Sequence, residues 1–228
     1  MSQSETLKRA AGQAAAGLVE SGMTVGLGTG STAAWFVRAL AERRLDVICV
    51  ATSEATAGLA ETLGLRLTEL DDVDAIDLTV DGADEIGPKL ALIKGGGAAL
   101  LREKLVWTAS RRCVVIADAS KPAVQLGGFP LPIEVIAFGH RHTAARIQAA
   151  LAASGIDATP SPRLKDGTPV LTDGGNLIYD APCREIADPA ALAAALKAVT
   201  GVVEHGLFLG LAERALIGTA EGVVTMWP

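Results

Sequence analysis

Hydrophobic positions alternate between two patterns over roughly the first half of the chain. Short apolar runs predict strands at 23–28, 46–51, 65–70, 75–80, 90–94 and 113–118. Apolar residues at a helical period predict helices at 4–21, 31–43, 54–63 and 97–109. Strands that are separated by helices form parallel sheets through right-handed crossovers. This region therefore predicts an α/β fold, a Rossmann-like parallel sheet with helices on both faces.

The pattern changes after "GGFPLP" (127–132). It continues as strand "IEVIAF", helix "HTAARIQAALAAS", strands "IDATPSPRL" and "NLIYD", helix "PAALAAALKAV" and strand "GVVEHGLFL". This β-α-β-β-α-β order predicts a smaller ferredoxin-like α+β domain. We therefore expect one domain of residues 1–128 with 205–228 and a second of 129–204, the tail "ALIGTAEGVVTMWP" returning to the first sheet.

Composition supports this fold class and excludes some partners. The 228 residues allow two domains with sizeable cores, and half of them are apolar while only 4% are aromatic, as in α/β proteins. The net charge is −6 with scattered basic residues, so we expect no nucleic-acid partner and no anionic membrane surface. The start lacks an apolar signal core, and no run reaches ~18 apolar residues, so we expect neither secretion nor a membrane span.

Three cysteines, Cys49, Cys113 and Cys183, are widely spaced and form no CxxC pair. The first two lie in apolar runs. This usage is typical of buried, reduced thiols in a cytoplasmic protein.

The stretch "GLGTGST" (26–32) follows the first strand. Its glycines permit close backbone approach, and Ser31 and Thr32 begin the next helix, whose free N–H groups attract anions. The third glycine comes one residue too early for the dinucleotide fingerprint, and the lysine of a P-loop is absent. Taken alone, the loop fits a structural turn, a small phosphate ligand or a nucleotide.

Carboxylates gather in "VDGADE" (80–85), just after another strand. Asp81, Asp84 and Glu85 repel one another, which raises the pKa of at least one of them and suits acid–base chemistry. A solvated acidic turn is the alternative. The pattern of a calcium loop is absent and no histidine lies nearby, so we expect no metal.

A third loop, within "IKGGGAALLREKL" (93–105), combines a lysine with three glycines. The N–H groups of the glycines bind an anion well when Lys94 supplies charge beside them. Glu103 lies on the helix that follows. Since Arg102 and Lys104 flank it, an exposed, ion-paired helix face explains Glu103 as well as a catalytic role does.

The motifs "GLGTGSTA", "DGADEI", "KGGGAALLREKLV" and "IADASK", in this order and spacing, resemble ribose-5-phosphate isomerase, type A. The resemblance continues through "FPLPIEVI", "LTDGGN", "GVVEHGLF" and "ALIGT", so it covers nearly the whole chain. It implies a Rossmann-like domain with a ferredoxin-like insertion. It also implies interconversion of D-ribose 5-phosphate and D-ribulose 5-phosphate, in the non-oxidative branch of the pentose phosphate pathway, without cofactor or metal, by a homodimer or homotetramer.

The resemblance also assigns the site residues. The substrate-binding positions it implies are Thr29, Gly30, Ser31, Thr32, Asp81, Gly82, Ala83, Asp84, Lys94, Gly95, Gly96, Gly97, Lys121 and, at the N-terminal helix, Lys8. Glu103 matches the base that moves the proton between C1 and C2 through an enediolate. Lys94 with the glycines suits the developing oxyanion, and Asp81 with Asp84 suits proton exchange with the sugar oxygens.

Two other functions use similar loops. A sugar-phosphate-sensing domain of a transcriptional regulator needs a DNA-binding module, but only 22 residues precede the first predicted strand and the net charge is negative. An NAD-dependent enzyme is the second alternative, which an assay without added nucleotide distinguishes. Related folds also host amino-sugar phosphate deaminases and coenzyme A transferases, so the fold alone does not decide the function.

Overall fold

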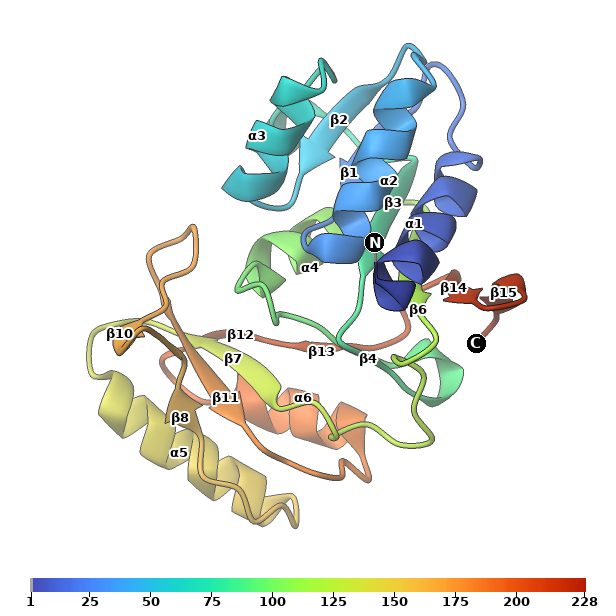
Figure 1. Cartoon of the computed structure of the whole chain (residues 1–228). Coiled ribbons are helices and arrows are strands. Elements are labelled where there is room, and N and C mark those ends of the chain that lie inside the picture. The colour runs from blue at the N-terminus through green and yellow to red at the C-terminus, as the bar shows by residue number, and fades with distance from the viewer. Residues whose placement is uncertain (1) are drawn as a thin grey trace. The chain divides into compact units, whose positions relative to one another are not determined.

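The computed structural model describes residues 2–228, which divide into two compact units (Figure 1). The first unit comprises the chain up to residue 83, together with 102–121 and 210–228. The second comprises residues 84–101 and 122–209. Each unit has its own hydrophobic core.

A six-stranded sheet forms the centre of the first unit, in the order β15-β14-β6-β3-β1-β2. All neighbours are parallel except the hairpin of β14 and β15. The strands are β1 (Thr24–Leu27), β2 (Ile48–Ala51), β3 (Leu78–Gly82), β6 (Cys113–Asp118), β14 (Arg214–Thr219) and β15 (Gly222–Met226). The last two strands confirm that the tail returns to the first sheet.

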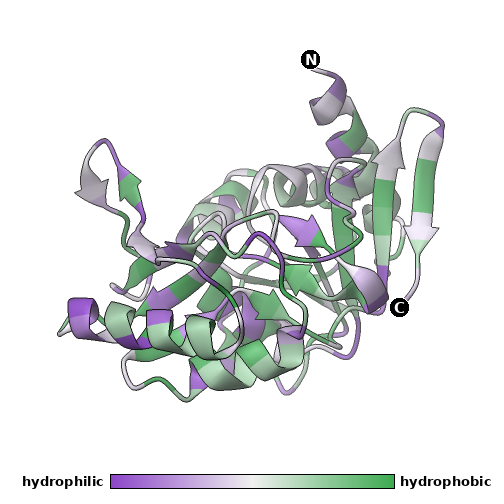
Figure 2. Cartoon of the chain, turned by 90° about the horizontal axis from the view of Figure 1, so that it is seen from below, coloured by the Kyte–Doolittle hydropathy of each residue, from purple (hydrophilic) through white to green (hydrophobic). Residues whose placement is uncertain are grey.

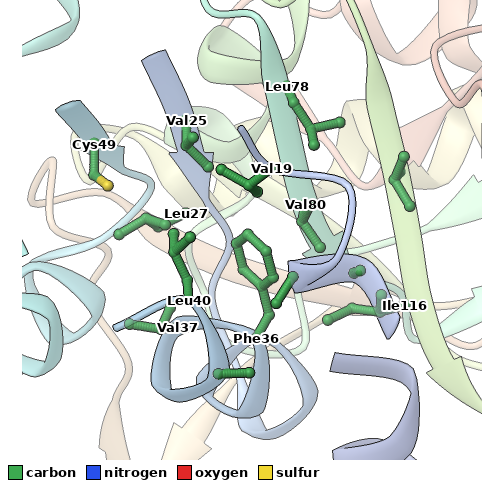
Figure 3. Packing of buried hydrophobic residues seen from close by; sticks show 14 of the residues in the cluster. Val19, Val25, Leu27, Phe36, Val37, Leu40, Cys49, Leu78, Val80 and Ile116 are labelled. Carbon is green, nitrogen blue, oxygen red and sulfur yellow. The ribbon is translucent and has the colours of Figure 1, made fainter. Parts of the chain in front are cut away.

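Helices cover both faces of this sheet. They are α1 (Gln3–Ala16), α2 (Ser31–Glu42), α3 (Glu54–Thr62) and α4 (Leu100–Thr108), with a short 3-10 helix, η1 (Leu70–Asp72). Figure 1 shows α1 and α2 side by side, and Figure 3 shows Phe36 of α2 packed among strand residues such as Leu27 and Val80. On the other face Val106 of α4 packs with Val50 and Ile76.

The hydrophobic pattern explains this layering. All six residues of β6, "CVVIAD", are buried, as expected for a parallel strand with helices on both faces. Figure 2 shows the strands as mostly hydrophobic segments. The predicted α/β class with a Rossmann-like parallel sheet is confirmed.

The second unit contains a four-stranded antiparallel sheet in the order β12-β7-β11-β8. Two helices cover one of its faces and supply Ile147 and Leu192 to its core. The elements are β7 (Leu131–Val135), α5 (His140–Ala153), β8 (Ser161–Pro162), β11 (Leu177–Ala181), α6 (Pro189–Lys197) and β12 (Val202–His205). This is the predicted β-α-β-β-α-β order of a ferredoxin-like domain.

Smaller elements complete the second unit. A three-stranded sheet has the order β13-β5-β4, and β9 pairs with β10 as a hairpin. Their bounds are β4 (Glu85–Ile86), η2 (Pro88–Leu90), β5 (Leu92–Ile93), β9 (Leu164–Lys165), β10 (Thr168–Pro169) and β13 (Leu207–Phe208).

The boundaries of the units differ from the expected domain boundaries. Residues 84–101, which we expected in the first domain, belong to the second unit, because β5 pairs antiparallel with β4 and β13 rather than with the parallel sheet. The predicted strand 65–70 is wrong: it forms one bridge, Leu67 to Cys49, before η1. The strand predicted over residues 156–164 is also mostly absent: only Ser161–Pro162 and the first residue of β9 are strand. Its prolines lack the N–H that a strand ladder needs.

Candidate active site

The order of the parallel strands locates a switch point in the first unit. Numbered along the chain, the five parallel strands lie in the order 2-1-3-4-5, and connections from β1 and β3 leave in opposite directions. In open α/β sheets, ligands bind at the carboxyl ends of the strands beside such a point. The loops after β1 and β3 therefore mark the candidate site within this unit.

Asp81 is fixed at the carboxyl end of β3. It is fully buried, and its Oδ1 accepts hydrogen bonds from Thr29 N at 3.0 Å and Gly82 N at 2.7 Å. A Cβ on Gly28 would overlap the Asp81 carboxylate and lie 2.5 Å from Asp81 Cα. The glycine of this loop is thus required by the close approach of the carboxylate.

The N-terminus of α2 points into the same loop. Gly30 is its N-cap, with φ +109°, and Ser31 and Thr32 are its first residues. No side chain caps this helix end, so its first N–H groups attract an anion.

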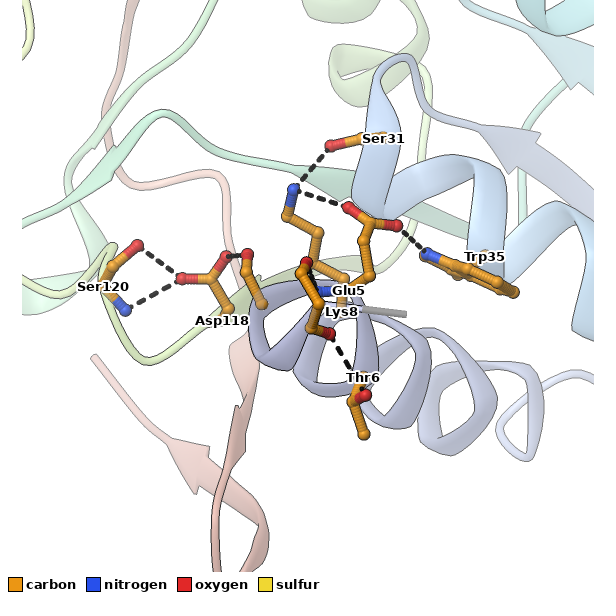
Figure 4. A network of polar contacts seen from close by, with 9 residues as sticks. Glu5, Thr6, Lys8, Ser31, Trp35, Asp118 and Ser120 are labelled. Atoms are coloured by element: carbon orange, nitrogen blue, oxygen red, sulfur yellow. Dashed lines mark hydrogen bonds and ion pairs between the residues drawn. The ribbon is translucent and has the colours of Figure 1, made fainter.

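Lys8 lies at this helix end, as Figure 4 shows. Its Nζ donates to Ser31 Oγ at 3.0 Å and to Glu5 Oε1 at 3.1 Å. Glu5 Oε2 accepts from Trp35 Nε1 at 2.9 Å, and this hydrogen bond, followed by that from Lys8, lowers the pKa of Glu5. The predicted phosphate contacts Lys8 and Ser31 are therefore neighbours.

The Thr29 side chain joins a hydroxyl cluster that the sequence reasoning missed. Thr29 Oγ1 lies 2.8 Å from both Thr52 Oγ1 and Ser53 Oγ and 3.2 Å from Thr56 Oγ1. Thr56 Oγ1 donates to Gly28 O at 3.0 Å. The stretch "ATSEAT" after the second strand carries these hydroxyls and is the signal that points to them.

Glu103 is buried on α4, with a relative exposure of 4%. It lies three residues before Val106, on the same helix face, and a Cβ on Gly26 of β1 would lie 2.9 Å from Val106 Cγ1. Glu103 therefore faces the sheet, on the side toward the carboxyl ends of β1 and β3. The alternative of an exposed helix face at Glu103 is wrong. Its neighbour Arg102, which is about half-exposed, pairs with Glu54 at 3.6 Å.

Lys121 follows the turn at the end of β6, where its N donates to Asp118 O at 3.2 Å. Asp118 accepts from Ser4 Oγ at 3.1 Å and from the N and Oγ of Ser120 (Figure 4). Burial acts to raise the pKa of Asp118, but the hydrogen bonds from Ser120 and Ser4 and the charge of Lys121 hold it below the ordinary value.

The second unit contains the remaining predicted residues. Asp84 Oδ2 accepts from Gly96 N at 2.7 Å, while Gly97 is exposed beside it. Lys94 is 2% exposed, and its Nζ lies 5.4 Å from the centre of the Phe208 ring. Gly95 has φ +106°, a conformation that side chains rarely adopt.

Glu85 hydrogen-bonds to the backbone of a nearby loop, which indicates a structural role. Its carboxylate accepts from Gly127 N at 3.0 Å, Gly128 N at 3.2 Å and Phe129 N at 3.1 Å. It is 7% exposed. The interpretation of "DGADE" as a solvated acidic turn is therefore wrong for Asp81 and Glu85, which are buried and hydrogen-bonded.

The predicted set thus falls into two groups. The first unit holds Lys8, Thr29–Thr32, Asp81–Ala83, Glu103 and Lys121, and the structure brings Thr29 to Asp81 and Lys8 to Ser31. Gly82 and Ala83 end β3 and its loop, half-buried. The second unit holds Asp84 and Lys94–Gly97, with Gly96 bound to Asp84.

A hollow of about 830 Å³ beside α3 and α4 has the wrong charge for a phosphate. Its lining includes Glu54, Glu61, Glu69, Asp71 and Asp72 against a single basic residue, Arg102. Across residues 2–228, no group of three or more His, Cys, Asp and Glu side chains is arranged to hold a metal ion. In the same range, none of the helices combines the length and apolar character that crossing a membrane requires.

The chain is similar to known proteins in both sequence and fold. Residues 48–222 match the family model of ribose 5-phosphate isomerase A (phosphoriboisomerase A). A ribose-5-phosphate isomerase A of Caulobacter sp. (strain K31) is 68% identical over 97% of both chains. The solved ribose 5-phosphate isomerase A of Neisseria gonorrhoeae is 33% identical, with a TM-score of 0.92 over 100% of this chain and 99% of that one. A D-ribose-5-phosphate isomerase solved with phospho-erythronic acid is 36% identical, with a TM-score of 0.91 over 100% of both chains.

Proposed function

The chain belongs to the ribose 5-phosphate isomerase A family, and from this premise we propose which of its residues bind and isomerise the sugar phosphate. The reaction of the family interconverts D-ribose 5-phosphate and D-ribulose 5-phosphate, and the chain is an isomerase of this kind. The observation that carries the residue assignment is the buried Asp81 carboxylate, held by Thr29 N–H at the switch point, with Glu103 on the helix face above.

Phosphate binds at the N-terminus of α2 in this proposal. The uncapped N–H groups after Gly30, the hydroxyls of Ser31 and Thr32 and the ammonium of Lys8 form a donor set that suits a dianion. Lys121, after the end of β6, adds a second cation at the same edge of the sheet. Binding the phosphate remotely from C1 and C2 contributes energy that orients the reacting carbons.

Glu103 moves the proton between C2 and C1. Its burial keeps the carboxylate away from bulk water and on the helix face that covers β1 and β3. A single base that serves both carbons is sufficient for an aldose–ketose isomerisation. Asp81 and, three residues later, Asp84 exchange protons with the sugar oxygens and assist ring opening.

Lys94, with the glycine loop of residues 95–97, stabilises the enediolate oxyanion. A buried ammonium beside an aromatic ring and a turn of glycine N–H groups provide positive potential without side-chain bulk. Phospho-erythronic acid, the ligand of the 36% identical relative, supports this step. Its carboxylate stands in for the oxygens on C1 and C2 of the enediolate, and its phosphate for that of the substrate.

The proposal extends to the cellular location, the pathway and the oligomeric state of the protein. We expect a cytoplasmic enzyme of the pentose phosphate pathway, which the buried, unbridged thiols of Cys49 and Cys183 support. Burial raises the pKa of the Cys49 thiol to about 12 and that of Cys183 to about 11, so neither is reactive. A homodimer or homotetramer is proposed from the family.

One assay tests the reaction. Purified protein should form ribulose 5-phosphate from ribose 5-phosphate in EDTA, with no nucleotide added. Loss of activity in EDTA that a divalent ion restores contradicts the metal-free mechanism. A requirement for NAD contradicts the isomerase assignment itself.

A further inference from the structure

The glycine loop that follows Lys94 is held on its carbonyl side by an arginine outside the assigned residues. Arg163 Nη1 donates to Gly95 O at 2.8 Å and to Gly96 O at 2.9 Å. The side chain of Arg163 has a relative exposure of 16%, and its bond to Gly95 O is partly buried while that to Gly96 O lies at the surface. Both the loop and Arg163 belong to the second unit.

Asp180 of β11 orients this guanidinium. Arg163 Nε donates to Asp180 Oδ2 at 2.8 Å, and Nη2 donates to Asp180 Oδ1. The backbone of Arg163 is tied down as well, since its N donates to Ile178 O at 2.8 Å and its O accepts from Val170 N at 2.9 Å. A planar guanidinium in a two-pronged pair with a carboxylate has a fixed orientation, which a lysine cannot reproduce.

Fixing the two carbonyls also fixes the N–H groups of the loop. In a planar trans peptide the C=O and N–H bonds point in opposite directions. With Gly95 O on Arg163, the N–H of Gly96 points to the other face of the loop, where it donates to Asp84 Oδ2 at 2.7 Å. With Gly96 O on Arg163, the N–H of Gly97 points away from Arg163 too.

The loop needs such support because its backbone is unusual. Gly95 has φ +106°, and Ala98, which closes the turn with an N–H to Gly95 O at 3.0 Å, has φ +59°. Glycine adopts a positive φ freely, whereas a left-handed alanine persists where surrounding contacts enforce it. Arg163 on one face and Asp84 on the other supply those contacts.

We propose that Arg163, oriented by Asp180, is a positioning residue that keeps the N–H of Gly96 on Asp84 and aims the N–H of Gly97 at the sugar oxygen that becomes negative in the enediolate. This role rests on the proposed function of the loop. Arg163 acts through the backbone, without touching the substrate. It gives the sheet of the second unit a part in the reaction.

Steady-state kinetics of Arg163→Ala and Arg163→Lys test the proposal. Since the loop stabilises charge that exists in the transition state, kcat should fall about 10- to 100-fold in both variants, as misplacement of catalytic groups does. KM should stay within about twofold, because the phosphate contacts are unchanged. Arg112→Ala is the matched control: it removes another arginine–carboxylate pair, with Glu213 at 2.7 Å, and should keep wild-type kcat.

Chemical rescue separates positioning from general stability. Guanidinium or methylguanidinium, below concentrations that unfold the wild type, should restore part of the kcat of Arg163→Ala, while sodium or ammonium should not. Wild-type kcat in Arg163→Ala overturns the proposal. So does a loss of kcat that no guanidinium restores and that tracks a lower thermal midpoint. If the alanine variant does not fold, Arg163→Lys keeps the charge and decides between the same outcomes.

A readout without turnover makes this inference separable from the proposed function. Amide exchange of Gly96, followed by NMR with glycine-labelled protein, should accelerate at least tenfold in Arg163→Ala, because its bond to Asp84 is no longer enforced. Unchanged exchange overturns positioning even if kcat falls. A wild type that does not isomerise ribose 5-phosphate contradicts the proposed function, while accelerated Gly96 exchange still supports the positioning of the loop.

Discussion

The chain contains two glycine-rich loops that we assign to anionic parts of one substrate, and they are built differently. The loop of residues 26–32 carries hydroxyl side chains, leads directly into a twelve-residue helix and has Lys8 at that helix end. The loop of residues 94–97 carries no hydroxyl, and its backbone is hydrogen-bonded to Arg163 and Asp84. We refer to them as the phosphate loop and the oxyanion loop.

The difference follows from the charge that each loop is proposed to meet. A phosphate is charged before and after the reaction, so a permanent set of hydroxyls, helix N–H groups and lysine binds it in every state. An enediolate oxygen is charged only transiently, so its donors accelerate the reaction only if they are already oriented when the charge appears. The phosphate loop should therefore govern mainly KM, and the oxyanion loop mainly kcat.

The largest expected effect on the rate comes from removing the base that transfers the proton between C1 and C2. Glu103→Gln keeps the size of the side chain but removes the base, so kcat should fall by about 10²- to 10⁴-fold with little change in KM. Deuterium incorporation from solvent should fall in parallel. Arg102→Gln, which removes the charge that pairs with the exposed Glu54, is the control and should keep wild-type rates. A Glu103→Gln enzyme that retains more than about a tenth of wild-type kcat places the base elsewhere.

Glu103 also illustrates how much of the candidate site can be predicted from the sequence alone. Strand, glycines and helix start of the phosphate loop follow one another along the chain, so the local pattern predicts this turn, although alone it fits a structural turn or a nucleotide as well as a phosphate. The burial of Glu103 could not be predicted from the sequence, since its flanking residues Arg102 and Lys104 indicate an exposed helix face equally well. Only the packing of Val106 against β1, one turn later, shows which face of α4 meets the sheet.

The oxyanion loop was the least predictable part of the fold. Its preceding strand has the apolar composition of a parallel strand, yet it pairs antiparallel with residues more than 100 positions later. Arg163, which holds its carbonyls, is 68 positions away from Gly95 and lies in a stretch that was predicted as strand. Hydrogen bonds between such distant positions leave no periodic pattern in a single sequence.

The second prediction breaks the coupling between the phosphate loop and Asp81. Gly28→Ala places a Cβ against the Asp81 carboxylate, so Asp81 or the loop must move. We expect kcat/KM to fall about 100-fold, with a loss of about 1–3 kcal/mol in the free energy of unfolding from overpacking. Kinetics with chemical denaturation measure both effects.

Gly58→Ala is the matched control for this change. Gly58 lies within α3 with open space around its Cα and no left-handed φ, so alanine should leave kinetics unchanged and stabilise the protein by about 0.5–1 kcal/mol. Wild-type kcat/KM in Gly28→Ala would mean that the position of Asp81 is not critical for the reaction.

The third prediction sharpens the assignment of KM to the phosphate loop. Lys8→Met should raise KM for ribose 5-phosphate about 10-fold or more, the contribution of one charge-assisted hydrogen bond, with kcat less affected. Trp35→Phe removes the N–H that holds Glu5, and Glu5 holds Lys8, so KM should rise about two- to fivefold.

Double-mutant kinetics check the connection between these residues. If Trp35 acts through Lys8, Trp35→Phe should have no further effect on KM in the Lys8→Met background. Trp227→Phe is the control: the Trp35 ring stacks on Arg38 at 5.3 Å, and the Trp227 ring stacks on Arg214 at 4.7 Å but lies on the C-terminal tail. Additive effects of Lys8→Met and Trp35→Phe would contradict the connection through Glu5.

The smallest expected effect concerns acid stability around the phosphate loop. The Asp118 carboxylate, which joins Ser4 of α1 to Ser120 after β6, has a folded pKa below its ordinary 3.8, so its contribution is complete above about pH 5 and is lost as pH falls through the folded pKa. Asp118→Asn should therefore lower the thermal midpoint by about 2–6 °C at neutral pH, which corresponds to roughly 1–2 kcal/mol, and by progressively less below about pH 4.

Glu213→Gln is the control, because hydrogen bonding to Arg112 also lowers the pKa of Glu213 and gives the same sign of pH dependence far from Lys8 in sequence. Both variants should lose acid-sensitive stability, but only Asp118→Asn should raise KM, since it loosens the end of the helix that carries Lys8. A difference in thermal midpoint that stays constant from pH 7 to about pH 3 would show that the ionised form of Asp118 is not what anchors α1.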